Sequence, residues 1–233
     1  MRAILATVGA SVVCAMVAGA TTCADTGKLE SIVLPRGSVI VAEGDSLTYG
    51  YDDTPGINNP PINGSHFTRS NKPYPEALGT LLKPNCGDVV NRGFPGDRSV
   101  DSLVRWQGAK AGALTLLMLG SNDALNYGRA ATGIVSVPTY NSVLSLMVEK
   151  LRREGSIVVI LLPPPIQNSR ADAMIAPYRE EAKKVAMRYG LLVVDVPSVL
   201  SGTTPVWNRD QVHLSEDSNT LLAEYLAKRI RCE

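Results

Sequence analysis

The chain has 233 residues, 45% of them hydrophobic, and a formal net charge of +1 at pH 7. This length and composition suit one domain with a sizeable core. Charged residues are spread along the chain, so no broad basic face is expected. Nucleic acid is therefore not expected as a partner.

The N-terminus has the pattern of an export signal. An apolar run rich in Ala and Val covers residues 4–18, after the early charge at Arg2. The run is shorter than a membrane-spanning helix requires, and small residues suited to cleavage follow it. We predict a signal peptide at residues 1–24 and a secreted or periplasmic domain at 25–233, without stable membrane insertion. A membrane anchor, or a lipoprotein attached through Cys23, stays open.

The number of cysteines also favours a secreted or periplasmic location. Removal of residues 1–24 also removes Cys14 and Cys23, which leaves Cys86 and Cys232. An even number of cysteines in an exported protein favours a disulfide, with two free thiols as the alternative. Neither cysteine has a second Cys or His at metal-ligand spacing, so we expect no metal site at either one. No cofactor is expected for this chain.

In chain order, residues 25–37 are expected to be irregular and residues 38–43 to form the first strand. Ser46 lies in the turn that follows it. Residues 50–73 are rich in Gly, Pro and Asn and have no sustained period, so they predict a long loop. A loop of this length next to Ser46 is expected to border the same cleft, and a plain surface insertion is the alternative.

Helices and strands alternate through the rest of the chain. The expected elements are a helix at 75–83, a strand at 88–91, a short helix after the Gly-rich loop 92–99, a strand at 114–119, a helix at 139–153, a strand at 157–162, a helix at 171–189, a strand at 191–194, and a last helix capped by Ser215. This alternation predicts an α/β fold with one five-stranded parallel sheet, order 2-1-3-4-5, covered by helices on both faces.

Residues that could take part in catalysis follow successive strands. Ser46 follows the first strand, Gly96 the second and Asn122 the third, and Asp210 and His213 come after the fifth. In a parallel sheet these positions lie at one edge, where ligands bind. We therefore expect them to meet in one cleft.

The residue types suit nucleophilic catalysis. A serine hydroxyl needs a base, and His213 is the candidate because His66 lies in the long loop without an acidic partner. Asp210 would orient the imidazole. The backbone N–H groups of Ser46 and Gly96 and the side-chain amide of Asn122 are the candidate oxyanion donors.

The same residues carry a family resemblance. The chain resembles the SGNH hydrolases, or GDSL esterases and lipases, in four blocks that keep the family's order across residues 38–220. These blocks are Gly44-Asp45-Ser46-Leu47, Asn91 to Asp97, Gly120-Ser121-Asn122-Asp123, and Asp210-Gln211-Val212-His213. The resemblance implies a flavodoxin-like three-layer α/β/α sandwich, no metal, and hydrolysis of carboxylic esters. The G-x-S-x-G signature of α/β-hydrolases is absent, because Thr48 stands two residues after Ser46.

These patterns predict an exported serine esterase for short-chain esters of a small molecule or a carbohydrate. Large apolar residues that could line an acyl site are few. The candidates are Leu47, Tyr49, Val206, Trp207 and Leu214 near the expected triad, with Tyr49, Tyr51 and Phe67 as possible wall from the long loop. A lysophospholipase or lipase, an acyltransferase, and a non-catalytic binding domain on the same fold stay open. The oligomeric state is not readable from the sequence.

Overall fold

A computed structural model describes residues 14–17, 20–23, 31–106, 110–125 and 133–233. The expected signal peptide lies outside these residues, apart from the short strands β1 (Cys14–Val17) and β2 (Ala20–Cys23), which pair antiparallel. Within the described ranges, no helix combines the length and the apolar character needed to cross a bilayer.

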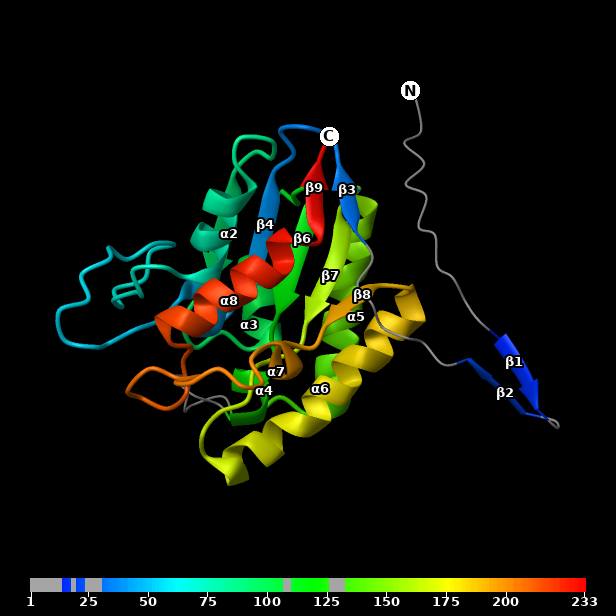
Figure 1. The fold of residues 1–233 in the computed structure, drawn as a ribbon. Coiled ribbons are helices and arrows are strands. Elements are labelled where there is room, and N and C mark those ends of the chain that lie inside the picture. The colour runs from blue at the N-terminus through cyan, green and yellow to red at the C-terminus, as the bar shows by residue number, and fades with distance from the viewer. Residues whose placement is uncertain (1–13, 18–19, 24–30, 107–109, 126–132) are drawn as a thin grey trace.

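A five-stranded parallel sheet forms the centre of the fold (Figure 1). Its strands are β4 (Ile40–Gly44), β5 (Val89–Gly93), β6 (Leu114–Met118), β7 (Ile157–Leu161) and β8 (Leu192–Val194). The order β5-β4-β6-β7-β8 confirms the predicted order 2-1-3-4-5. Every residue of β4 and β6 is buried, as expected for strands of a parallel sheet that is covered on both faces. The one charged residue in these two strands, Glu43, forms an ion pair with Arg92.

Helices cover both faces of this sheet. The core on one face is formed with three helices, α2 (Tyr74–Leu82), α7 (Val196–Val199) and α8 (Glu216–Ala227). The core on the other face is formed with α3 (Ser99–Arg105), α5 (Val137–Arg153) and α6 (Ser169–Tyr189). Alternate residues of β6 enter the two cores: Leu116 faces the first and Leu117 the second. The three-layer α/β/α sandwich is therefore confirmed.

Capping explains why two helices begin earlier than periodicity predicts. The Ser136 hydroxyl accepts a hydrogen bond from the Thr139 amide and starts α5 two residues before the expected position. The Asn168 side chain accepts from the Ala171 amide and does the same for α6. Caps lie outside the apolar stripe, so a periodicity count begins after them.

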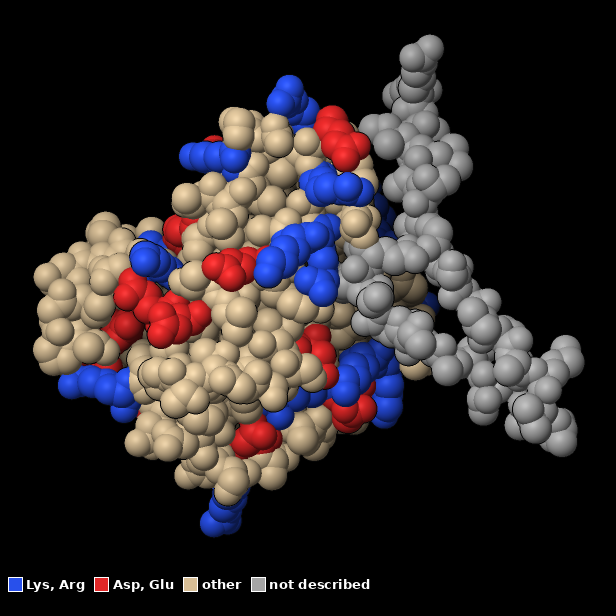
Figure 2. All heavy atoms as spheres, in the orientation of Figure 1, with Lys and Arg blue, Asp and Glu red and all other residues tan. Residues whose placement is uncertain are grey.

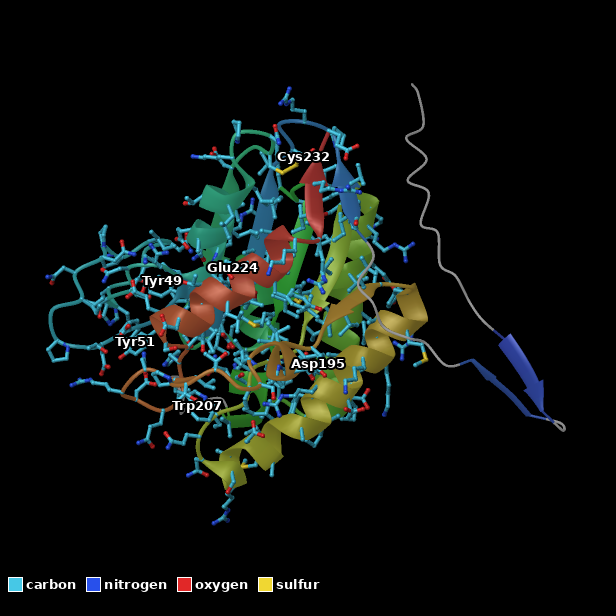
Figure 3. All side chains as sticks on the ribbon, viewed as in Figure 1. Tyr49, Tyr51, Asp195, Trp207, Glu224 and Cys232 are labelled. Atoms are coloured by element: carbon cyan, nitrogen blue, oxygen red, sulfur yellow. A yellow bond between two sulfur atoms is a disulfide. The ribbon has the colours of Figure 1, made fainter. Side chains whose placement is uncertain are left out.

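Two short strands are absent from the predicted set. β3 (Ile32–Leu34) and β9 (Ile230–Cys232) pair in parallel as a separate sheet, so the expectation of irregular structure across 25–37 is wrong at residues 32–34. Three residues are too few to establish a period of two. At the same end of the molecule Cys232 is joined to Cys86, with the Cα atoms 5.2 Å apart (Figure 3).

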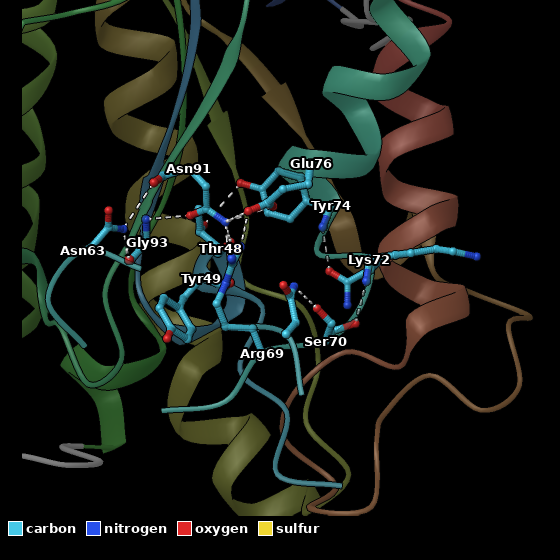
Figure 4. Close-up of polar contacts among 12 residues, drawn as sticks. Thr48, Tyr49, Asn63, Arg69, Ser70, Lys72, Tyr74, Glu76, Asn91 and Gly93 are labelled. Carbon is cyan, nitrogen blue, oxygen red and sulfur yellow. Dashed lines mark hydrogen bonds and ion pairs between the residues drawn. The ribbon is translucent and has the colours of Figure 1, made fainter. Parts of the chain in front are cut away.

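The long loop 50–73 is fastened to the sheet edge by buried polar contacts (Figure 4). The Arg69 guanidinium is buried, donates to the Tyr49 carbonyl at 3.0 Å and pairs with Glu76 on α2. The Asn63 amide donates to the carbonyls of Asn91 and Gly93, on β5. These contacts link the loop to β5, the strand next to β4, and to the short segment that follows Ser46. The loop is therefore held in a fixed position beside Ser46.

Candidate active site

Ser46 stands at a tight turn between β4 and the short helix α1 (Ser46–Tyr49). Gly44 leaves no room for a side chain, since a Cβ there would lie 2.2 Å from the Thr48 hydroxyl and 2.6 Å from the Met118 carbonyl. Asp45 caps α1 by accepting a hydrogen bond from the Leu47 amide at 2.9 Å. The turn and the cap together place Ser46 at the first position of the helix.

The structure brings Ser46, His213 and Asp210 into one hydrogen-bonded chain. Nε2 of His213 lies 2.7 Å from the Ser46 Oγ, and Nδ1 of His213 lies 2.6 Å from Oδ2 of Asp210. The other Asp210 oxygen accepts from the backbone amides of Val212 and His213 at 2.8 and 2.9 Å. Gln211 adopts a positive φ of 65°, and this turn folds both amides back to one carboxylate.

The surroundings of Asp210 favour its ionised form. Partial burial is the largest single influence and raises the pKa of this carboxyl. The hydrogen bond and charge of His213, together with the amides of His213 and Val212, act in the opposite direction and leave the pKa of Asp210 below its ordinary value. Asp210 is therefore a carboxylate at neutral pH, as a partner for an imidazole N–H should be.

The two other expected donors line the cavity that contains Ser46. Gly96 has a φ of 81° and comes from the loop after β5. Asn122 comes from α4 (Ser121–Leu125), directly after β6. Its buried side-chain nitrogen donates to the Asp97 carbonyl at 3.0 Å and to Oδ2 of Asp45 at 3.3 Å, and these contacts fix the orientation of the amide.

Asp45 is an acidic residue of this site to which the sequence reasoning gave no role. Its side chain is buried and contacts both the helix that begins at Ser46 and the Asn122 amide. Burial, reinforced by the nearby carboxylates of Asp123 and Asp97, raises the pKa of Asp45 to about 7. The only sequence signal for it was its position in the first block, next to Ser46.

A cavity of about 440 Å³ opens beside the serine. Its polar members are Ser46, Asp53, Ser121, Asn122, Asp210 and His213, and its remaining wall is formed by Leu47, Tyr51, Phe67, Pro95, Gly96, Leu125, Ile166 and Val212. The Tyr51 ring centroid lies 4.5 Å from that of His213, so the long loop supplies an aromatic contact to the imidazole. The expectation that this loop borders the cleft agrees with this lining.

Several residues expected in the wall lie elsewhere. Tyr49 is fully buried, and its hydroxyl donates to the Phe67 carbonyl at 2.6 Å. Leu214 is buried in the core, whereas Val206 and Trp207 line a separate cavity. Ile166 and Leu125 also lie in the wall. Sequence reasoning missed Ile166 because it assigned no role to the segment after β7, and it missed Leu125, at the end of α4, because it considered only Asn122 in the segment after β6. The carboxyl end of a buried strand was the signal available for Ile166.

His66 takes no part in this geometry, since its ring stacks on Phe67 with a centroid distance of 4.2 Å and does not line the cavity. Among the described residues, no cluster of three or more His, Cys, Asp or Glu side chains is arranged to hold a metal ion. On the face drawn in Figure 2, basic and acidic residues are interspersed and form no broad patch of one sign.

Fold and site together define a hydrolase of the SGNH type. The chain belongs to the GDSL-like lipase/acylhydrolase family, whose model matches residues 42–221. It is accordingly a carboxylic ester hydrolase. A search of curated proteins finds no match.

Solved structures share the fold at low sequence identity. LAE5, an alpha/beta hydrolase from the metagenome of Lake Arreo, is 23% identical with a TM-score of 0.64, over 83% of this chain and 96% of LAE5. A putative lipolytic protein of the G-D-S-L family from Desulfitobacterium hafniense is 23% identical with a TM-score of 0.65, over 82% and 98%. Axe2, an acetylxylan esterase from Geobacillus stearothermophilus, is 21% identical with a TM-score of 0.65, over 84% and 95%.

Proposed function

We propose that this protein is an exported serine esterase that hydrolyses short-chain carboxylic esters through an acyl-enzyme on Ser46. The observation that carries the proposal is the continuous chain from the Ser46 Oγ to His213 at 2.7 Å and from His213 to Asp210 at 2.6 Å. A nucleophile, a base and an orienting carboxylate at these distances are the parts that acyl transfer requires.

In the acylation step, Nε2 of His213 takes the hydroxyl proton while the Ser46 Oγ attacks the ester carbonyl carbon. The carbonyl oxygen becomes an oxyanion, stabilised by the backbone N–H groups of Ser46 and Gly96 and by the side-chain amide of Asn122, which exchanges its 3.3 Å hydrogen bond to Asp45 for one to the oxyanion. The imidazolium, held through Nδ1 by Asp210, then gives its proton to the leaving alcohol oxygen. The products of this half are the free alcohol and Ser46 in ester linkage to the acyl group.

In deacylation, a water molecule attacks the acyl carbon and its proton passes to His213. Collapse of the second tetrahedral intermediate releases the carboxylic acid, and the proton returns to the Ser46 Oγ. No metal ion takes part in either half of this scheme.

A short acyl group suits the size of the cavity. Its volume of about 440 Å³ is near the lower end of the range for small-molecule sites and has to hold part of the alcohol as well. The apolar side chains Leu47, Leu125, Ile166 and Val212 provide wall for a few methylene groups. This supports acetyl to butyryl esters over long-chain lipids.

Replacement of Ser46 tests the mechanism. We expect purified Ser46→Ala to lose turnover of p-nitrophenyl acetate, because the variant has no oxygen to carry the acyl group. His213→Ala should be about as damaging, since the members of a triad act as a unit. Retention of wild-type esterase activity by folded Ser46→Ala would reject the proposal.

Export and the disulfide complete the proposal. A signal peptide over residues 1–24 would deliver the domain to an oxidising compartment, where a bond between Cys86 and Cys232 can form and persist. The 5.2 Å Cα separation of the two cysteines supports this pairing.

A further inference from the structure

Tyr51 lines the cavity that contains Ser46 and has no role in the scheme above. Its ring centroid lies 4.5 Å from that of His213, and the two ring planes are tilted by 45°. Packed aromatic rings have centroids about 4.5–7 Å apart, so this separation is at the short end of the range. The Tyr51 ring therefore contacts the base of the triad directly.

The turn at the end of α1 fixes where the Tyr51 backbone lies. Gly50 ends the helix with a φ of 81°, and a Cβ at this position would lie 2.4 Å from the Pro73 side chain. The amides of Gly50 and Tyr51 both donate to the Ser46 carbonyl, at 2.9 and 3.0 Å. Tyr51 is thus hydrogen-bonded to the residue that carries the nucleophile.

The long loop holds Tyr51 from the other side. The backbones of Tyr51 and Arg69 form an antiparallel bridge, and the buried Arg69 guanidinium is itself fixed on the Tyr49 carbonyl (Figure 4). The Phe67 ring packs against the Tyr51 ring at a centroid distance of 5.5 Å and an interplanar angle of 69°. These contacts restrict the Tyr51 ring, so it lies against His213 before a substrate binds.

The polar end of Tyr51 contributes little to this arrangement. Burial, together with the carboxylates of Asp53 and Asp210, raises the pKa of Tyr51, so its hydroxyl is neutral at neutral pH. Asp53 is paired with Arg209 at 3.2 Å. None of the residues that the structure describes forms a hydrogen bond with the Tyr51 hydroxyl. The aromatic ring, and not the hydroxyl, is therefore the part of Tyr51 that acts on His213.

The charge of His213 changes during the reaction, and the contact gains strength with it. In both halves of the scheme His213 takes a proton from the attacking oxygen and becomes an imidazolium. The face of an aromatic ring carries negative charge and attracts a cation within about 6 Å of the ring centroid. The neutral imidazole of the free enzyme is attracted less. An interaction that is stronger in the transition state than in the ground state raises kcat.

We propose that Tyr51 is a positioning residue for the base of the triad. The face of its ring holds the His213 imidazole beside Ser46 and stabilises the imidazolium that forms in the transition state. The inference rests on the esterase function proposed above and adds a residue that acts through His213. Tyr51 lies outside the four sequence blocks that carry the family resemblance.

A series of rings of nearly equal shape tests this assignment. Tyr51 is replaced by Phe (Tyr51→Phe) and then by mono-, di- and trifluorophenylalanine, because each fluorine withdraws negative charge from the ring face. Tyr225 is the matched control: its ring lies 3.6 Å from the Arg229 guanidinium, and it does not line the Ser46 cavity. The same replacements are made there. The measured quantities are kcat and KM for p-nitrophenyl acetate.

We expect Tyr51→Phe to keep kcat within about twofold of the wild type, because the ring remains. Successive fluorination should then lower kcat stepwise, by about threefold to thirtyfold for the trifluorinated ring, with KM nearly constant. The series at Tyr225 should keep the wild-type kcat.

A kcat that does not change along the Tyr51 series would reject stabilisation of the imidazolium and leave the esterase function standing. A trend in KM alone would assign the ring to substrate binding and reject the proposal as well. If the wild type does not hydrolyse p-nitrophenyl acetate and Ser46 is not acylated, the esterase function itself fails.

Discussion

Asn122 holds its side-chain amide between the Asp97 carbonyl and the Asp45 carboxyl at the edge of the cavity that contains Ser46. If this amide stabilises the oxyanion, Asn122→Ala should lose roughly 2.7–4 kcal/mol of transition-state stabilisation, or about 10²–10³ in kcat, with little change in KM. Steady-state kinetics on p-nitrophenyl acetate measure this. A loss of less than about threefold would remove Asn122 from the set of oxyanion donors.

Asp45 should make the unfolding free energy of the protein depend on pH. Its folded-state pKa of about 7 lies above the ordinary value of 3.8, because the side chain is buried. The protonated form is therefore favoured in the folded state, and this contribution is complete below about pH 4 and is lost as pH rises through 7. Asp45→Asn cannot ionise, so its unfolding free energy should depend less on pH between 4 and 7 than that of the wild type.

Urea unfolding of wild type and Asp45→Asn at several pH values across this range measures the difference. Asp123 keeps a residual slope in both proteins, since burial raises its pKa to about 6. Asp210, with a lowered pKa, loses its contribution only at more acidic pH, as pH falls through its folded pKa. Parallel stability curves for the two proteins would contradict the assignment to Asp45.

Among the elements, the long loop 50–73 contributes Phe67 to the wall of the cavity that contains Ser46. In the wild type we expect kcat/KM to be highest for acetyl to butyryl p-nitrophenyl esters and to fall toward dodecanoyl. Phe67→Ala removes a side chain that limits the space for the acyl group. The ratio of kcat/KM for the octanoyl ester to kcat/KM for the acetyl ester should therefore rise by about fourfold or more, the equivalent of one additional buried methylene.

Phe94 provides the control for that experiment. It is the other of the chain's two phenylalanines, packs against the Arg105 guanidinium at 5.0 Å and does not line the cavity. Phe94→Ala should keep the wild-type chain-length profile. A wild-type preference for dodecanoyl esters would instead indicate a lipase or lysophospholipase.

The sequence predicted those elements whose signal is local. Continuous apolar runs such as 114–119 identified the sheet, and alternation with helices predicted its order. The three-residue pair β3 and β9 could not be predicted, because it depends on residues about 200 positions apart and carries no periodicity. Strand ends likewise indicated Ser46, Asn122 and His213, whereas the contact of Tyr51 with His213 depends on how a long loop folds.

At the scale of the whole molecule, the bond between Cys86 and Cys232 closes a loop of 146 residues. The chain-entropy model gives such a closure about 5 kcal/mol, and measured values are often smaller. Cys232→Ser should therefore lower the unfolding free energy by a few kcal/mol, and the Cys86→Ser/Cys232→Ser double variant should lose no more than the single one. Two alkylatable thiols in an unreduced preparation of residues 25–233, detected by mass spectrometry, would refute the bond.

The whole fold is also needed to place Ser46 against His213, which is 167 positions away in the chain. Covalent labelling of the intact protein tests this central claim most directly. A fluorophosphonate should attach once, to the peptide containing Ser46, and the reaction should be at least about a hundredfold slower in His213→Ala, because the serine then has no base. Labelling at another residue, or an unchanged rate in His213→Ala, would contradict the proposed mechanism.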